Sequence, residues 1–310
     1  MKTLRNILVI VDPTREEQPA IAKAARLATR VDARVQLFAC ETPSSREARW
    51  SSKHVRAGSA PLPLDLALLL ERWSEPLRAN GLEVTVECTT ARHLHPAILR
   101  RACATAIDLL VKDTHHHSLP QRAFLTNTDW HLIRGCPVPL LLTKPQPWKD
   151  RPVVLAALDP NHLHDKPALL DHHLLEWGAT LRSILGGELH GVHAYVPLAL
   201  AAAVGSTAGA AAVSPQMIME EQARRQAQVR ELTAPYDIPE RNVHVDLGSA
   251  VEIVPHLADE LHADIVTMGA ISRSSAELFL IGHTAERVLE RVGADVLVVK
   301  PPDFAECLPL

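Results

Sequence analysis

A glycine-bracketed connection near the end of the chain reads GAISRSSAELFLIGHT, residues 269–284. Gly269 and Gly282 enclose serines and an arginine, and Thr284 follows directly. Glycine lets the backbone turn sharply and approach a ligand closely. A helix beginning near Thr284 would direct its first amides at an anion, and its dipole would favour the negative charge. The segment is therefore typical of a phosphate-binding connection between a strand and a helix.

The chain contains two related halves, because several segments recur in the same order. The pairs are NILVIVDP at 6–13 with PVVLAALDP at 152–160, AIDLLVKDTHHHS at 106–118 with HADIVTMGAISRS at 262–274, and TDWHLIRGCPVPLLLTKP at 128–145 with TAERVLERVGADVLVVKPP at 284–302. In the last two pairs the offset is a constant 156 residues. Three prolines in residues 144–152 make the joint between the halves stiff. We therefore expect two copies of one domain, 1–146 and 147–310.

Each half alternates apolar strand patterns with helical patterns. The predicted strands are 7–11, 35–41, 83–88, 108–112, 139–143, 153–158, 188–196, 242–247, 264–268 and 296–300, and the predicted helices are 19–30, 64–80, 95–105, 129–134, 167–185, 215–233, 251–261 and 284–292. The strand patterns are near-continuous runs of Val, Ile and Leu, as expected when helices cover both faces of a sheet. Alternating strands and helices favour right-handed crossovers and a parallel sheet. The sequence predicts an α/β fold of two tandem, doubly wound, five-stranded parallel-sheet domains.

The connection in the first half that corresponds to 269–284 contains no glycine. It reads DTHHHSLPQRAFLTNTD, residues 113–129, with Asp113 at the position of Gly269 and Thr126 at that of Gly282. The carboxylate of Asp113 would repel a phosphate. We therefore expect the first half to lack a phosphate-binding connection of the kind predicted in the second.

The pattern G-x-x-S-(x9)-G-H-T-A-E-x-V, followed by V-L-V-V-K-P, resembles the universal stress protein family. The aspartate at the end of the first strand in each half and the duplication itself belong to the same resemblance. It covers essentially the whole chain, and the last fifty residues or so are its most specific part. The two-domain layout is similar to that of the tandem E-type members.

The resemblance implies a ligand and the residues that hold it. Nucleotide-binding members carry G-x-x-G-(x9)-G-S/T, and in them an aspartate after the first strand and a backbone group after the second hold adenosine. Here those positions are Asp159 and Ala194, and the connection would hold phosphates. The candidate nucleotide-binding residues are Leu158, Asp159, Ala194, Met268, Gly269, Ser272, Gly282, His283 and Thr284. The implied ligand is ATP or another adenine nucleotide.

Two candidate residues depart from the family pattern. Ser272 stands where the middle glycine belongs, and its Cβ would obstruct a ligand if the backbone there needs a positive φ. His283 replaces a small hydroxyl residue; it is bulkier, but its ring can donate a hydrogen bond to phosphate. Two interpretations therefore stay open: a connection that still binds nucleotide, and one that only joins strand to helix.

Two other segments invite functional interpretations. His115, His116 and His117 suggest a metal site, but adjacent side chains usually diverge and no i,i+4 pair supports them, so we expect solvated histidines and commit to no metal. The Ala- and Gly-rich residues 198–213 favour a mobile surface insertion; the alternative is a lid or an apolar contact surface.

Composition excludes several classes of protein. A net charge of −4, a pI near 6.5 and 4% aromatic residues give neither a basic field nor a stacking surface for nucleic acid. No apolar run approaches the roughly 18 residues of a membrane span. The first residues of the chain include too few consecutive apolar residues for a signal peptide. Five scattered cysteines without a C-x-x-C pair favour reduced thiols. We expect a cytoplasmic protein with no membrane or nucleic-acid partner.

No catalytic signature stands out. The chain has no G-x-S-x-G, H-E-x-x-H or G-x-x-x-x-G-K-[ST] pattern. We therefore expect a stress-response binding and regulatory module rather than an enzyme, with a protein partner that the sequence does not identify. The alternatives are a metal- or apolar-ligand-binding stress protein without a nucleotide site, and a slow ATPase.

The last predicted strand of each half generates a testable prediction about association. PLLLTKP at 139–145 and DVLVVKP at 295–301 would otherwise be exposed apolar edges. The resemblance implies that such edges pair antiparallel with another copy of the domain. Because the second copy belongs to the same chain, we expect the two halves to pair about a pseudo-two-fold axis. Cysteines introduced near Leu141 and Val298 should then crosslink within one chain. A separation beyond the reach of the crosslinker would contradict this arrangement.

Overall fold

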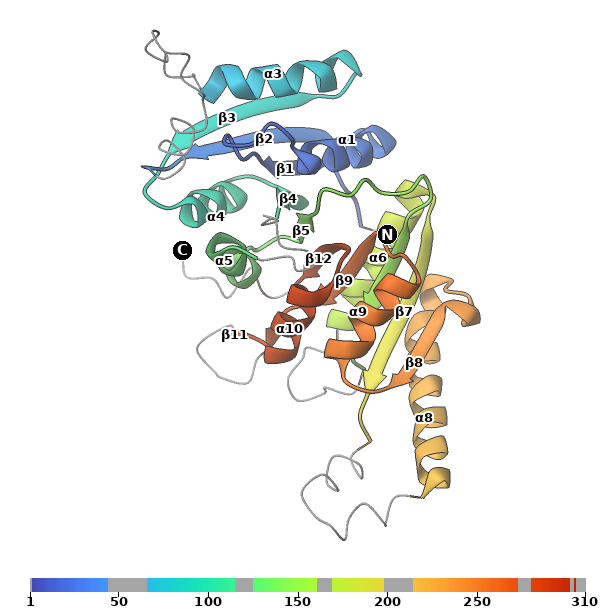
Figure 1. The fold of residues 1–310 in the computed structure, drawn as a ribbon. Helices are drawn as coiled ribbons and strands as arrows, with labels where there is room; N and C mark the ends of the chain where they lie inside the picture. The colour runs from blue at the N-terminus through green and yellow to red at the C-terminus, as the bar shows by residue number, and fades with distance from the viewer. Residues whose placement is uncertain are drawn as a thin grey trace. The chain divides into compact units, whose positions relative to one another are not determined.

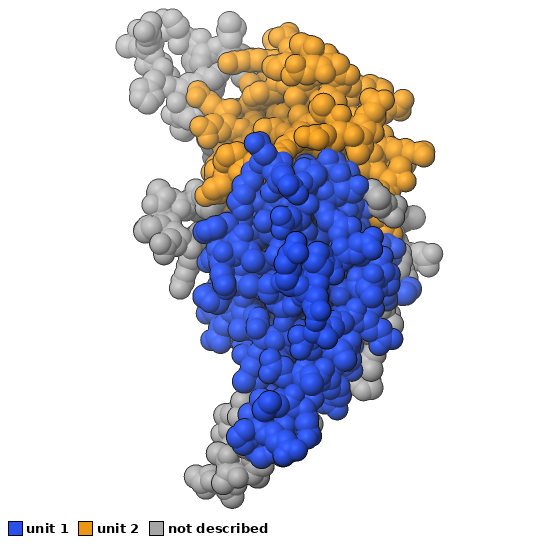
Figure 2. All heavy atoms as spheres, turned by 90° about the vertical axis from the view of Figure 1, so that its right-hand side faces the viewer, with its two compact units in different colours: residues 1, 149–302 blue, residues 2–148, 303–310 orange. Residues whose placement is uncertain are grey.

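A computed structural model describes residues 2–43, 66–114, 125–160, 169–197, 214–272, 280–301 and 304. They form two compact units, residues 2–148 with Phe304, and residues 149–301 (Figure 2). The histidines at 115–117 and the Ala-rich residues 198–213 lie outside the described residues. No helix in the described ranges is long and apolar enough to cross a membrane.

The N-terminal unit is built around a five-stranded parallel sheet (Figure 1). Its strands are β1 (Asn6–Ile10), β2 (Arg34–Glu41), β3 (Val84–Thr90), β4 (Leu109–Asp113) and β5 (Leu140–Thr143), in the order β3-β2-β1-β4-β5. The longer helices are α1 (Pro19–Val31), α3 (Leu66–Ala79), α4 (Leu94–Ala104) and α5 (Asn127–Gly135). Central strand residues such as Leu8 and Val111 are fully buried, which explains why these segments show no polar alternation.

The C-terminal unit repeats this plan. Its strands are β6 (Val153–Ala157), β7 (Glu188–Tyr195), β8 (Val243–Leu247), β9 (Ile265–Gly269) and β12 (Asp295–Val299), in the order β12-β9-β6-β7-β8 and all parallel. Its helices are α6 (Leu170–Leu185), α8 (Pro215–Thr233), α9 (Ala250–Glu260) and α10 (His283–Arg291), with short 3-10 helices at Ala234–Tyr236 and Glu240–Asn242. The α/β fold of two doubly wound five-stranded domains is confirmed.

One pair of strands was not predicted. β10 (Ile271–Ser272) and β11 (Leu280–Ile281) pair antiparallel within the connection 269–284. Two-residue strands carry no periodic signal, so the sequence pattern could not have indicated them.

Local chemistry sets several helix boundaries. The hydroxyl of Ser214 accepts a hydrogen bond from the Met217 amide at the start of α8, and Ser249 does the same for the Val251 amide at the start of α9. Gly186 ends α6 with a φ of 66°, a left-handed conformation that glycine adopts without a steric penalty. These caps position the helices against the sheet in the C-terminal unit.

A reciprocal contact links the start of the first strand to the start of the fourth in each unit. In the C-terminal unit Asp264 donates its amide to the Val153 carbonyl at 2.9 Å, and its Oδ2 accepts from the Val153 amide at 2.8 Å. In the N-terminal unit Asp108 donates to the Asn6 carbonyl at 3.0 Å and accepts from the Asn6 amide at 2.9 Å. The two aspartates are 156 residues apart, so the contact is part of the repeat.

We predict that Asp264→Ala lowers the free energy of unfolding of the full chain by about 2–4 kcal/mol. The substitution removes the acceptor of the part-buried Val153 amide, a hydrogen bond to a charged group that contributes about 1.5–3 kcal/mol, and that of the exposed Lys149 amide, which contributes less. Urea unfolding followed by circular dichroism measures this change. Glu260→Ala, at an exposed position of α9 with the same change of charge, should stay within about 0.5 kcal/mol. Equal losses in the two variants would contradict the prediction.

Candidate functional site

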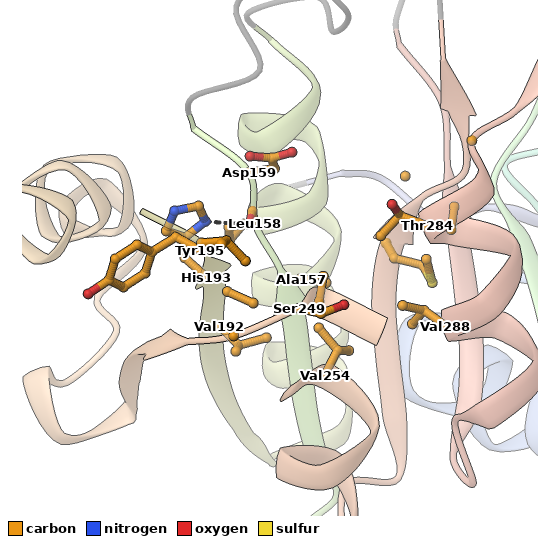
Figure 3. A pocket seen from close by; sticks show the side chains of 18 of the residues that line it. Ala157, Leu158, Asp159, Val192, His193, Tyr195, Ser249, Val254, Thr284 and Val288 are labelled. Atoms are coloured by element: carbon orange, nitrogen blue, oxygen red, sulfur yellow. Dashed lines mark hydrogen bonds between the residues drawn. The ribbon is translucent and has the colours of Figure 1, made fainter. Parts of the chain in front are cut away.

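A cavity of about 660 Å³ opens at the carboxyl ends of the strands in the C-terminal unit (Figure 3). The ends of β6, β7 and β9 and the starts of α9 and α10 surround it. Ligands bind at this edge in open α/β sheets because the strand ends and the helix starts converge there. Eight of the nine sequence-predicted residues line it: Leu158, Asp159, Ala194, Met268, Gly269, Gly282, His283 and Thr284. The ninth, Ser272, lies in β10, and its side chain is outside the described part of the chain.

The end of β6 is held in place from two sides. The Leu158 amide donates to the Val192 carbonyl at 2.8 Å, and the Asp159 amide donates to Oδ1 of the buried Asp171 at 3.1 Å. Asp171 belongs to the first turn of α6. Asp159 is thus presented at the cavity by backbone contacts to β7 and α6.

The two glycines of the connection have ordinary backbone conformations. Gly282 has a φ of −63°, and Gly269 is also outside the left-handed region, so neither makes the sharp turn that the sequence suggested. A Cβ at Gly269 would lie 2.7 Å from Cδ2 of Leu170 in α6, so that side chain would have to shift if another residue stood there. The Gly282 amide donates to the Ala270 carbonyl at 3.1 Å, which closes the connection near its base.

The start of α10 carries no side-chain cap among the described residues. Its N-cap residue is Gly282, which has no side chain to offer. The first amides of a helix have no partner within the helix, so they remain donors toward whatever lies beside them. His283 and Thr284 line the cavity, so the start of α10 borders it.

The corresponding helix start in the N-terminal unit is closed by its own side chains. Thr126 stands at the position of Gly282; its Oγ1 accepts from the Asp129 amide at 3.2 Å, and Asp129 accepts from the Thr126 amide at 2.7 Å. Asp113, at the position of Gly269, accepts from the Ala20 amide and from the Thr143 hydroxyl, and burial raises the pKa of its carboxyl. Here the acceptors of the helix start come from the protein itself.

Two residues of β7 at the cavity were missed by the sequence reasoning. His193 is 2% exposed, and its Nδ1 lies 3.1 Å from the Leu158 carbonyl, so Nδ1 carries the proton (Figure 3). Burial lowers the pKa of His193, although the hydrogen bond to Leu158 and nearby Asp159 act in the opposite direction. Tyr195 is 5% exposed, and burial raises the pKa of its phenol. The available signal was a histidine and a tyrosine at the carboxyl end of a predicted strand, on either side of the candidate Ala194.

The walls of the cavity differ in character. Figure 3 shows Leu158 and His193 on one side and Thr284 and Val288 on the other. Apolar groups from three elements, including Val192, Val254 and Met268, contribute to the lining. Arg225 of α8 lies 6.0 Å from the Tyr195 ring. The arrangement combines an apolar surface with donors at the α10 start, and no described group of three or more His, Cys, Asp or Glu side chains is placed to hold a metal ion.

The low pKa of His193 generates a prediction for stability. Above its ordinary pKa of 6.5 the ring is neutral in both states; as the pH falls below that value, the unfolded chain takes up a proton before the folded chain does. Stability is therefore lost toward acid. His193→Asn keeps a donor for Leu158 but cannot titrate, so from about pH 8 to about pH 5.5 the wild type should lose more stability than this variant.

Urea unfolding at the two pH values measures the difference. The control is His256→Asn, which makes the same replacement at an exposed position of α9 and should follow the wild type. Equal pH dependence of the wild type and His193→Asn would contradict the prediction.

Comparison with known proteins agrees with this architecture. The sequence profile of the Universal stress protein family matches residues 3–144 and again residues 166–300. Universal stress protein E of Salmonella typhi and that of Escherichia coli (strain K12) are each 28% identical to this chain over 317 residues, covering 98% of this chain and 96% of theirs.

Solved structures agree at the level of the fold. A crystal structure from Pseudomonas aeruginosa UCBPP-PA14 is 26% identical, with a TM-score of 0.76, and covers 98% of this chain and 95% of its own. A universal stress protein from Archaeoglobus fulgidus DSM 4304 has a TM-score of 0.61 at 16% identity and covers 95% of this chain and 98% of its own. Because the family profile matches both halves and these relatives span almost the whole chain, this chain belongs to the universal stress protein family, in its tandem two-domain form.

Proposed function

We propose that the C-terminal unit binds an adenine nucleotide in the 660 Å³ cavity, and that the protein acts as a stress-response binding module rather than an enzyme. The observation that carries the proposal is the convergence of eight sequence-predicted residues on one cavity beside an uncapped helix start. The volume lies within the range of about 300–1,000 Å³ that small-molecule sites occupy.

The residues around the cavity suit the two parts of a nucleotide. Asp159 and the backbone at Ala194 would hold the nucleoside against apolar groups such as Met268. The first amides of α10 would hold phosphate oxygens, helped by the Thr284 hydroxyl and the His283 ring. A helix start contributes about 0.3–1 kcal/mol to the binding of an anion at an exposed site, and up to about 2 kcal/mol when the site is partly buried.

Binding rather than reaction is favoured by how the polar side chains near the cavity are used. His193 is engaged with the Leu158 carbonyl and Asp171 with the Asp159 amide, so both act on the backbone that shapes the cavity. The bound state would regulate a protein partner. An apolar ligand at the same cavity is the rival proposal, because aliphatic side chains form much of the lining.

We predict that Gly282→Val weakens nucleotide binding by at least about tenfold, about 1.4 kcal/mol, without unfolding the unit. The backbone at Gly282 has a φ of −63°, which valine also adopts, so the added side chain changes the space before α10 rather than the chain path. Calorimetric titration of the purified full chain with ATP, ADP and AMP measures the effect. Gly293→Ala, beyond the other end of α10, is the control and should bind like the wild type.

A second variant tests the altered connection 269–284 in the same titration. Ser272→Gly combined with His283→Ser restores the pattern of the nucleotide-binding members and should strengthen binding. If neither the wild type nor the restored variant binds any of the three nucleotides, the proposal fails. Displacement of a fluorescent apolar probe by fatty acids instead would support the rival.

A further inference from the structure

The outer edge of the C-terminal sheet is the strand β8, which among the described strands is hydrogen-bonded to β7 alone. Their register places Val192 opposite His244. Beyond the carboxyl end of β8 the chain forms part of the cavity wall through Gly248 and Ser249. An edge strand has a ladder on one side only, so the contacts that hold β8 to β7 also hold this part of the wall.

Two histidines on these strands contact each other through their ring nitrogens. Nδ1 of His190 in β7 lies 3.1 Å from Nε2 of His244 in β8, and the ring planes are inclined by only 10°. His190 is buried and His244 is half-buried. A neutral imidazole has one N–H and one acceptor nitrogen. The contact is therefore a hydrogen bond when one of the two facing nitrogens carries a proton and the other does not.

A carboxylate on the other side of His190 selects the direction of this hydrogen bond. Oε2 of Glu188 lies 3.8 Å from Nε2 of His190. Its negative charge favours a proton on that nitrogen, which leaves Nδ1 of His190 as the acceptor and Nε2 of His244 as the donor. The contact can keep its geometry when His244 takes up a proton on its other nitrogen. A proton on Nδ1 of His190, however, would place two N–H groups face to face.

The charged groups that act on the two rings are Glu188 of β7, Arg241 of the 3-10 helix Glu240–Asn242, Asp246 of β8 and Glu260 of α9. The carboxylates favour charged rings, and the guanidinium opposes them. Burial, and after it the neighbouring His244, lowers the pKa of His190, and burial lowers the pKa of His244. The closed pair therefore resists protonation, whereas two histidines released into water would each titrate near pH 6.5.

We propose that the contact between His190 and His244 is a pH-sensitive switch, which holds β8 on β7 at neutral pH and releases it when both imidazoles carry a proton. Two like charges on rings whose nitrogens are 3.1 Å apart repel each other, and the facing N–H groups have no acceptor between them. Release of β8 would move the wall that Gly248 and Ser249 form, so acidification would reach the C-terminal cavity. This inference does not depend on which ligand that cavity holds.

Linkage gives the direction and the size of the effect. At about pH 7.5 few histidines with the ordinary pKa of about 6.5 are protonated in either state, so the contact contributes its full stabilisation. At about pH 5.5 the released pair carries close to two protons, while the closed pair carries at most one. A difference of one proton over one pH unit favours release by about tenfold.

Amide hydrogen exchange of the purified full chain, read by mass spectrometry and corrected for intrinsic exchange rates, measures the opening of β8 directly. We expect the protection of residues 243–247 to fall by at least about tenfold from about pH 7.5 to about pH 5.5. The protection of the central strand β9 should fall less, because the switch acts on the edge of the sheet and not on the whole unit.

Two variants assign the effect to the histidine pair. His244→Gln keeps a side-chain amide beside His190 that can donate to the neutral ring or, after rotation, accept from the protonated one. This variant should therefore lose most of the acid-induced change in the protection of β8. His256→Gln makes the same replacement at an exposed position of α9 and should behave like the wild type.

NMR of the imidazole nitrogens in the wild type gives a second readout that needs no variant. The pair formed by His190 and His244 should take up its second proton at a lower pH than the ordinary value of about 6.5. The proposal is overturned if β8 keeps its protection at the lower pH, if His244→Gln loses as much protection as the wild type, or if β9 loses as much as β8. Titration of both rings together at the ordinary value would overturn it as well.

Discussion

The reciprocal contact of Asp108 and Asp264 with the first strand of each unit is the constraint on which the functional edge depends. A carboxylate that is mostly removed from water must be hydrogen-bonded, and the Asp264 side chain is only 6% exposed. It meets that requirement with the backbone amides of Lys149 and Val153. The contact fixes the register of the fourth strand against the first. Since the strands within a unit are parallel, their carboxyl ends then meet at one edge of that unit's sheet, and the cavity of the C-terminal unit lies there.

Each unit has one copy of this edge, and the two copies differ in which helix starts are capped by a side chain. An uncapped helix start presents amides that need an acceptor, whereas a side-chain oxygen at the cap supplies one internally. In the C-terminal unit Ser249 closes α9 while α10 stays open at Gly282; in the N-terminal unit Thr126 closes α5 while α4 stays open at His93. A change of one residue at a cap therefore alters what an edge can hold without disturbing the sheet beneath it.

The buried polar groups near the C-terminal cavity hold the backbone that shapes it. His193 of β7 lines the cavity, Asp171 of α6 lies behind it, and each is hydrogen-bonded to the backbone at the end of β6. The cost of burying them is offset by those hydrogen bonds. Such groups define where Leu158 and Asp159 stand, which suits a site that must discriminate between ligands by fit.

Much of this architecture could be predicted from the sequence, because its signals are local. Apolar runs without alternation marked buried strands such as 108–112, and the constant offset of 156 residues marked the duplication. The candidate residues at 158–159, 194 and 268–284 followed from the same alignment with the family pattern. The caps at Ser249 and Thr126 were not predicted, although both are residue types that favour helix starts.

Other features were decided only by the tertiary structure. Leu170, about a hundred residues earlier in the chain, packs so closely against Gly269 that a Cβ there would make the leucine side chain shift, and no turn propensity contains that fact. Arg225 of α8 lies with its guanidinium carbon 6.0 Å from the centroid of the Tyr195 ring in β7, a contact between residues distant in the sequence. Sequence periodicity reports which face of an element is buried, whereas the chemistry of a cavity depends on which buried faces oppose one another, and that is set by packing between elements distant in the chain.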